Sequence, residues 1–430
     1  MLLLVAALNA VLRSPVLPWV AGFALTLVVC GVLWWPVPMH MADMRALTAF
    51  GDSHVWVFER IVAAFGAGEL PQDGCLAGYP QTRSMRAIGW AAALVVVPLR
   101  TVLSPLAAAN LVQLISLPLS GLAAAALVRR WTDADRWTAV WMGACFALCP
   151  TLLGTFATAE ISNTQAWILP LFLLVADRAG DRPRWSLAVA ALGLLSALTS
   201  PYYALALPLL GGGLALVRWV QARRVRLADL LWLGALALGL APAAWYFSPA
   251  SAGGGASMFR PARRAVSLLP DLPHPPPVAQ LDQLLIDTVV GPGSPFETVH
   301  AVSLGLALAV LGAVGVARRR RGWQAGVLLG IGGLLMALGP ALYAGGHLVM
   351  VAGRALVLPF WALEQLGWPT AMGGLYYRYA VVMVLGVVVL GASALSGVRR
   401  APAIAGLVLA IQLGQGIAET GPLWPRPTSP

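Results

Sequence analysis

Residues 51–86 read GDSHVWVFERIVAAFGAGELPQDGCLAGYPQTRSMR and form a polar interval in an otherwise apolar sequence. The spacing of its apolar side chains predicts an amphipathic helix, which a Gly- and Pro-containing run ends. These apolar residues are Trp56, Phe58, Ile61, Val62 and Phe65. An amphipathic helix lies at the membrane surface with its apolar face in lipid. We therefore expect the carboxylate of Asp52, at the turn before this helix, to be held at that surface.

The overall composition is that of an all-α polytopic membrane protein. Of 430 residues, 59% are hydrophobic and only 10% are charged, which excludes an ordinary soluble domain. We treat residues 1–430 as a single membrane domain. The net charge of +11 comes from arginine alone, because the sequence has no lysine. Since these arginines alternate with apolar runs, they indicate cytoplasmic loops and not a nucleic-acid partner.

The cysteines and the N-terminus agree with this class. Cys30, Cys145 and Cys149 lie in apolar segments and Cys75 stands alone in the polar interval, so no disulfide framework is expected. The N-terminus lacks a basic region and a cleavage site, which is typical of an uncleaved signal anchor.

The apolar runs predict eleven membrane spans, because a spanning helix needs about 20 apolar residues. They cover residues 16–35, 107–128, 137–157, 164–176, 185–199, 201–216, 227–246, 301–316, 323–342, 377–395 and 401–417. A further apolar segment, 87–103, is interrupted by Pro98, Arg100 and Pro105. We interpret it as a re-entrant or interfacial helix, because Arg129 and Arg130 then join the other arginine clusters in the cytoplasm. This topology puts the N-terminus inside and the C-terminus outside.

Three intervals then lie on the outer side: residues 36–86, which hold the juxtamembrane helix, the Pro/Gly-rich residues 247–300, and residues 343–376. Twelve of the 17 acidic residues fall on this side or at its membrane edge. The outer face is therefore where we look for chemistry.

Two outer acids stand out. Glu160 lies in a turn between two predicted spans, and a carboxylate beside the hydrocarbon edge is costly unless it is paired or functional. The alternative is that Glu160 only caps the following helix with Ser162, Asn163 and Thr164. For Asp52 the alternative is likewise an N-cap of the amphipathic helix.

The order of one span, an outer loop with an acidic residue opening an amphipathic helix, a Gly-rich break and then Tyr-Pro resembles the GT-C superfamily. These integral-membrane glycosyltransferases use polyprenyl-phosphate sugars. The resemblance implies an active-site acid at Asp52, a second acidic position at Glu160 and a substrate segment at Gly78-Tyr79-Pro80, where Gln81 replaces the usual second Pro or Gly. The runs 198–205 (LTSPYYAL), Leu304-Gly305 and Tyr377-Arg378-Tyr379 also resemble YfhO-type membrane proteins. We expect no C-terminal outer domain of the kind that the best-known of these enzymes have.

Sugar transfer from a lipid phosphate needs a base, which we assign to Asp52, and cations that neutralise the leaving phosphate. Arginine binds two phosphate oxygens at once, and Arg83, Arg86 and Arg378 are predicted on the outer side. Their alternative role is anchoring to ordinary phospholipid headgroups.

No cofactor is assigned. A Ser53/His54/Asp52 triad is disfavoured because sequence neighbours rarely converge as a triad. A divalent metal near His40, Asp43 and His54 stays open, although the spacing matches no strong ligand motif. The expected partners are a polyprenyl-phosphate-linked sugar and membrane lipids, in a bacterial inner membrane with the active face outward. The competing functions are a lipid or solute transporter or flippase, and a catalytically inactive GT-C-like scaffold.

Overall fold

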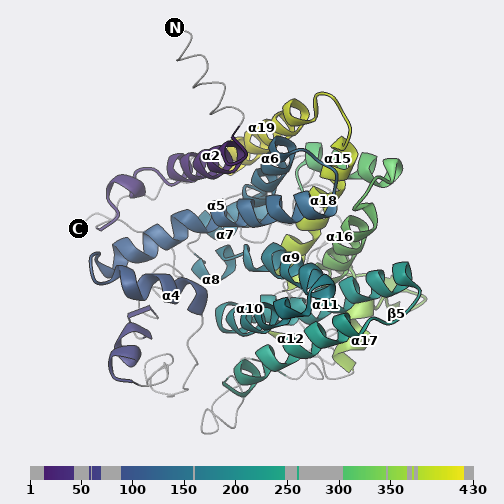
Figure 1. The fold of residues 1–430 in the computed structure, drawn as a ribbon, viewed down its shortest axis with the longest axis horizontal. Helices are drawn as coiled ribbons and strands as arrows, with labels where there is room; N and C mark the ends of the chain where they lie inside the picture. The colour runs from purple at the N-terminus through teal and green to yellow at the C-terminus, as the bar shows by residue number, and fades with distance from the viewer. Residues whose placement is uncertain are drawn as a thin grey trace.

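A computed structural model of the chain describes residues 14–42, 58–59, 61–68, 89–157, 160–246, 259–260, 304–344, 347–365, 370–371 and 376–420. This part of the protein is mostly helical (Figure 1). Its α-helices are α2 (Leu17–Leu33), α4 (Trp90–Leu99), α5 (Pro105–Trp131), α6 (Arg136–Ala147), α7 (Pro150–Ala157), α8 (Ile161–Thr164), α9 (Ile168–Asp181), α10 (Ser186–Thr199), α11 (Pro201–Ala222), α12 (Leu227–Tyr246), α15 (Leu306–Arg318), α16 (Trp323–Ala337), α17 (Pro359–Gln365), α18 (Ala380–Leu395) and α19 (Ala401–Thr420). Short 3₁₀ helices are η1 (Val37–Met39), η2 (Pro183–Trp185) and η3 (Tyr376–Tyr379).

Within the described residues, four helical segments are long and apolar enough to cross a membrane: α5, α11, α12, and η3 together with α18. Helices α6 and α7 would make a fifth if taken as one span, with a bend of 54° between them. The sequence predicted a single helix over 137–157, and this is wrong. Pro150 has no N–H to continue the preceding helix, and it disfavours helical geometry at the residue before it, so α6 ends and α7 begins at the proline.

Helix α18 is the centre of the bundle. All sixteen of its residues are buried, as expected for a helix that is apolar on every side. It packs closely against α16, because Gly386 faces the backbone of Gly330 and leaves no room for a Cβ. Small residues at such an interface let two helix backbones approach, which is the usual way helices associate in membranes. Figure 1 shows α5 crossing the middle of the same bundle.

The arginine clusters gather at one end of the bundle. Arg321, in the turn between α15 and α16, contacts both Asp133 and the carbonyl of Arg130 at the end of α5. Arg130 in turn contacts the last turn of α9, and Arg318 donates to the carbonyl of Ala394 at the end of α18. We call this end of the helices the arginine end. Arg130 therefore lies with the other clusters, as the re-entrant interpretation of 87–103 requires.

Helix α4 explains why Arg130 lies at the arginine end, because this helix is not a membrane span. It has only ten residues and contains Pro98, so it is too short for an ordinary span. Its N-terminal residues bind the last turn of α10, where Gly89 N–H donates to the carbonyl of Leu198 and Ala91 N–H to the hydroxyl of Thr199. Since α10 begins at the arginine end, α4 lies at the opposite end, together with the start of α5.

Strands are few and short among the described residues, and no pattern in the sequence indicated them. Two antiparallel pairs lie within 341–344 and 347–357: β2 (Tyr343–Ala344) with β3 (His347–Leu348), and β4 (Met350–Val351) with β5 (Arg354–Ala355). Ala341 also bridges Val357, and we call these residues the hairpin. A third pair joins β1 (Phe259–Arg260) to β6 (Thr370–Ala371). This last pair brings together two of the intervals predicted to be on the outer side.

Candidate functional site

Two residues singled out from the sequence, Glu160 and Arg378, meet in the structure. Nη2 of Arg378 lies 3.1 Å from Oε1 of Glu160. The side chains are 3% exposed for Glu160 and 11% exposed for Arg378. The remaining candidates lie outside the described residues, so their roles stay predictions: Asp52, Tyr79, Arg83 and Arg86.

Glu160 lies at a break in the helices. It precedes the single-turn helix α8, and its carbonyl accepts the N–H groups of Asn163 and Thr164 at 2.9 and 3.1 Å. Its side chain makes no capping bond to the backbone; Oε2 accepts instead from Nδ2 of Asn163 at 2.7 Å. The carbonyl of Glu160 therefore begins the helix α8, whereas its carboxylate does not cap the helix and instead binds Arg378.

Arg378 is held by aromatic side chains from two helices. Its guanidinium carbon lies 4.7 Å from the ring centroid of Tyr202 in α11 and 5.8 Å from that of Tyr377. Such cation–π contacts favour arginine over a neutral residue. Nε also lies 3.4 Å from the hydroxyl of Tyr377, so it donates at the limit of a hydrogen bond. Tyr202 and Arg378 belong to the two Tyr-containing motifs noted in the sequence, which the fold brings into contact.

Buried polar side chains surround the ion pair. Oδ1 of Asn163 accepts from the hydroxyl of Ser200 at 3.0 Å, and the carbonyl of Asn163 accepts from the hydroxyl of Tyr203. On the other side, Oε1 of Gln113 in α5 accepts from the hydroxyl of Thr164 at 2.9 Å. Buried polar groups need such partners, so α5, α8 and α11 are fixed to one another here.

Residues 58–59 and 61–66, the helical residues described in the segment predicted as an amphipathic helix, are in helical conformation. Phe58 and Ile61 are 2% and 0% exposed and belong to the same buried hydrophobic cluster as Ile161, the neighbour of Glu160. The expectation that this apolar face lies in lipid is therefore wrong for Phe58 and Ile61, which are buried in protein. Glu59 on the polar face lies 2.7 Å from Nε of Arg100, just after α4.

The arrangement is suited to holding an arginine for an anionic ligand. Each oxygen of the Glu160 carboxylate already accepts a hydrogen bond, so the group orients Arg378. Among the described residues, no acceptor takes a hydrogen bond from Nη1 of Arg378. A guanidinium that is oriented through Nη2 and keeps Nη1 available can bind a phosphate oxygen.

Metal binding is a separate question. The described residues contain no group of three His, Cys, Asp or Glu side chains arranged to hold an ion. Of the residues considered from the sequence, His40 is described, whereas Asp43 and His54 lie outside the described ranges. Cys145 and Cys149 are free thiols and fully buried.

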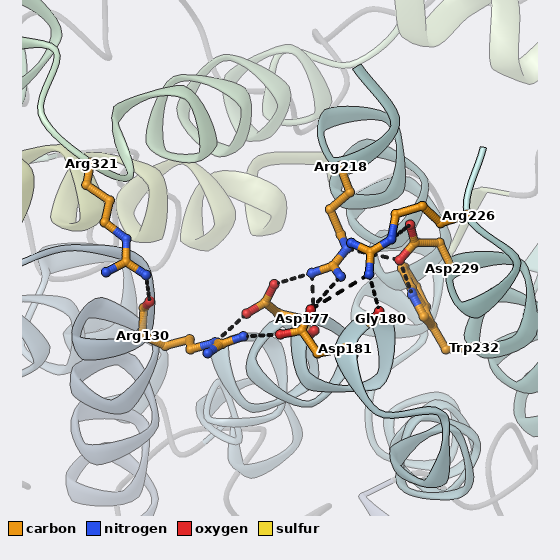
Figure 2. A network of polar contacts seen from close by, with 9 residues as sticks. All are labelled: Arg130, Asp177, Gly180, Asp181, Arg218, Arg226, Asp229, Trp232 and Arg321. Carbon is orange, nitrogen blue, oxygen red and sulfur yellow. Dashed lines mark hydrogen bonds and ion pairs between the residues drawn. The ribbon is translucent and has the colours of Figure 1, made fainter. Parts of the chain in front are cut away.

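A second polar cluster lies at the arginine end of the bundle (Figure 2). At its centre is Arg218 of α11, whose side chain is 9% exposed. It binds three carboxylates: Nη1 lies 2.6 Å from Asp177, Nη2 lies 2.9 Å from Asp181 and Nε lies 3.0 Å from Asp229. Arg130 of α5 binds Asp177 and Asp181 from the other side. The cluster thus joins α5, α9, α11 and α12.

Burial and neighbouring charges shift the pKa of Asp181 in opposite directions. Burial raises the pKa of this carboxyl, but hydrogen bonds and charge attraction, from Arg218 first and then from Arg130, outweigh it. The pKa therefore lies below its ordinary value. Asp229 is fully buried, and its Oδ2 has no hydrogen-bond partner among the described residues; Nε of Arg226 lies 4.0 Å from it. Nη2 of Arg226 donates to the carbonyl of Gly180 at 2.7 Å.

This cluster was not predicted, because its acids fall on the predicted cytoplasmic side and only the outer acids were considered as site residues. The five remaining acids are Asp133, Asp135, Asp177, Asp181 and Asp229. Four of them pair with arginines, and Asp135 caps α6. Asp177 and Asp181 are four residues apart, which puts them on one helix face, and this spacing was the available signal.

Comparison with known proteins adds no assignment. The sequence matches no known protein family, and neither a curated protein nor a solved structure is detectably similar to it.

Proposed function

We propose that this protein is a GT-C-like glycosyltransferase of a bacterial inner membrane, with about eleven spans. It would move a sugar from a polyprenyl-phosphate donor to an acceptor at the outer face. The observation that carries the proposal is the buried pair of Glu160 and Arg378, which a polar side-chain network surrounds. A charged pair at membrane depth is expensive and is a functional site by default.

The orientation rests on the arginine end. Cytoplasmic loops carry an excess of Lys and Arg, so the arginine end faces the cytoplasm and the Glu160–Arg378 pair faces outward. Along α11, Tyr203 and Arg218 are 15 residues apart. At 1.5 Å per residue this is about 22 Å, less than the roughly 30 Å of the hydrocarbon core. In the proposed topology the pair lies slightly below the outer membrane surface, and the lipid phosphate would approach it from the side.

The roles follow from the chemistry of transfer. The acceptor oxygen attacks the anomeric carbon, the bond from that carbon to the phosphate oxygen breaks, and the electron pair leaves with the polyprenyl phosphate. Asp52 takes the acceptor proton, and Arg378, oriented by Glu160, neutralises the leaving phosphate. Arg83, Arg86 and Tyr79 would bind the rest of the donor. The shared hydrophobic cluster of Phe58, Ile61 and Ile161 supports a common site, because the helical residues 58–59 and 61–66 follow Asp52 in the sequence.

The test measures sugar transfer from radiolabelled polyprenyl-phosphate sugars by the full chain in proteoliposomes. Asp52→Asn should lower turnover by about 10²- to 10⁴-fold, as loss of a general base does. Arg378→Gln should lower it too, with partial recovery in Arg378→Lys. Arg354→Gln is the matched control, because it removes an exposed arginine at the same end of the bundle. Unchanged turnover in Asp52→Asn would remove the proposed base.

A transporter or flippase is the second candidate, and one observation favours it. Residues 136–181 form a broken series of helices, α6 to α9, with Glu160 at a break. Transporters build binding sites from such discontinuous helices. The same proteoliposomes separate the two functions: movement of labelled donor lipid between leaflets without sugar transfer would favour a flippase. Folded protein that does neither would favour the inactive scaffold.

A further inference from the structure

The arginine end contains a cavity of about 460 Å³ that the proposed sugar transfer does not use. Its size falls in the range of small-molecule sites. The charged lining residues come from three helices and two turns: Arg130, Asp177, Asp181, Arg218, Arg226 and Arg321. Gln221 and Gln324, which hydrogen-bond to each other at 2.9 Å, close another wall.

The lining arginines differ in how many of their donors are occupied. Arg218 is fully engaged, since Nε, Nη1 and Nη2 each donate to a carboxylate. Arg226 makes one hydrogen bond, to the carbonyl of Gly180, while Asp181 and Asp229 lie 3.9 and 4.0 Å away. Arg218 therefore has a structural role in the wall of the cavity, because all of its donor nitrogen atoms are occupied. Only one donor nitrogen of Arg226 is occupied.

Arg321 and Arg130 also keep donors available. Arg321 is 59% exposed and uses Nη1 for Asp133 and Nη2 for the carbonyl of Arg130. Arg130 uses Nε and Nη2 for the carboxylates of α9. Within the described part of the chain, Nε of Arg321, Nη1 of Arg130, and Nε and Nη1 of Arg226 donate to no acceptor. Four guanidinium donors without an acceptor therefore belong to three arginines that line one cavity.

We propose that this cavity binds a phosphate group, with Arg226, Arg321 and Arg130 donating to its oxygens. Several arginines from different elements around a small cavity match the geometry that binds phosphate. The four lining arginines exceed the two lining aspartates, although Asp133 and Asp229 pair with Arg321 and Arg218 from outside the cavity. The guanidinium donors without an acceptor, more than the net charge of the lining, define the phosphate site.

The phosphate could belong to a lipid headgroup or to a soluble phosphate. Leu214, Val217 and Ala325 line the cavity from α11 and α16, and Leu216 and Val220 of α11 are exposed on the outside of the bundle. Such an apolar border suits the chains of a lipid whose headgroup enters between the two helices. Basic pockets between membrane helices on the cytoplasmic side bind anionic headgroups in this way.

The test compares a lipid that carries a phosphate group with a lipid of the same chains that lacks it. The full chain in neutral detergent at about 0.15 M salt, where surface charges are screened, is titrated with phosphatidic acid and with diacylglycerol of the same chains. Separate titrations use inorganic phosphate against chloride at equal ionic strength. The readout is the thermal unfolding midpoint, which rises with a ligand that binds the folded state. Phosphatidic acid should raise it and diacylglycerol should not. A rise with inorganic phosphate as well supports the phosphate site and shows that no lipid chain is needed.

Variants assign the binding to the cavity. Arg321→Gln, at a largely exposed side chain, and Arg226→Gln should each weaken phosphatidic acid binding about tenfold, the usual value of one hydrogen bond to a charged group. Arg226→Lys should keep part of the affinity and replaces Arg226→Gln if that variant does not fold. Arg399→Gln removes the same charge from an exposed position at the same end and should bind like the original protein. Equal stabilisation by diacylglycerol, or equal weakening in Arg399→Gln, would overturn the proposal. So would no stabilisation by either phosphate ligand.

Discussion

Glu160 and Arg378 are 218 positions apart in the sequence, and their side chains are joined at 3.1 Å in the buried part of the bundle. The contact links the residue before α8 to η3, which leads directly into the central helix α18. Removing one partner of a buried ion pair leaves an uncompensated charge, whereas removing both does not.

We therefore predict that Glu160→Gln and Arg378→Gln each lower the free energy of unfolding by about 3–5 kcal/mol. The double variant should lose clearly less than the sum of the two. The measurement is a double-mutant cycle, in which tryptophan fluorescence monitors the unfolding of each variant in detergent. The control cycle on Glu59 and Arg100, whose side chains are 39% and 24% exposed, should give a coupling of only about 0.5 kcal/mol. Additive losses at Glu160 and Arg378 would show that the pair is not coupled.

Hydropathy predicted much of the helical layout. Helix α12 has the predicted bounds, 227–246, and α10 and α11 begin within one residue of the predicted starts. The interruption of 87–103 by Pro98 and Arg100 also indicated a segment that does not cross, and α4 is short. Apolar runs indicate where a helix can be buried. The positions of these helices and the interruption of 87–103 depend only on this local property.

The remaining features depend on tertiary contacts. Both motif tyrosines and Arg378 were noted in the sequence, but their meeting depends on how α11 packs against η3. The three-aspartate environment of Arg218 needs α9 and α12 to meet α11, and no local pattern specifies this. The sequence therefore allowed a list of candidate residues assigned to one side of the membrane, of which only Glu160 and Arg378 can be compared with the structure.

A second prediction concerns Gly180. A Cβ built at this position would lie 2.4 Å from Nη2 of Arg218 and 2.6 Å from Oδ1 of Asp229. Arg218 cannot move aside freely, because three carboxylates hold it. Gly180→Ala should lower the free energy of unfolding by about 1–3 kcal/mol, as overpacking does. Gly212→Ala is the matched control: no atom lies within 4 Å of its Cβ, so alanine should raise helix stability by up to about 1 kcal/mol. Equal effects at both positions would show that the cluster tolerates the added methyl group.

A third prediction concerns pH. The pKa of Asp181 in the folded protein lies below its ordinary value, which is about 3.9 for an unfolded chain. A depressed carboxyl pKa stabilises the folded state at pH values above the unfolded pKa, and this contribution disappears as pH falls through the folded pKa. The stability difference between the original protein and Asp181→Asn should thus be constant from pH 7 to about 5 and shrink below about pH 4. Because the side chain is 46% exposed, the difference is small. A difference that grows on acidification would contradict the sign of the shift.

The last prediction tests the orientation on which the proposed function depends. Arg354 lies in the hairpin after α16 and Arg399 lies between α18 and α19, at opposite ends of the bundle, and both are exposed. Each is changed to cysteine in a Cys75→Ser background, since the three described cysteines are buried free thiols. A membrane-impermeant maleimide should label Arg354→Cys in intact cells and Arg399→Cys only after the membrane is permeabilised. The opposite pattern would put the arginine end outside, against the positive-inside rule. Glu160 and Arg378 would then face the cytoplasm, and transfer at the outer face would be ruled out.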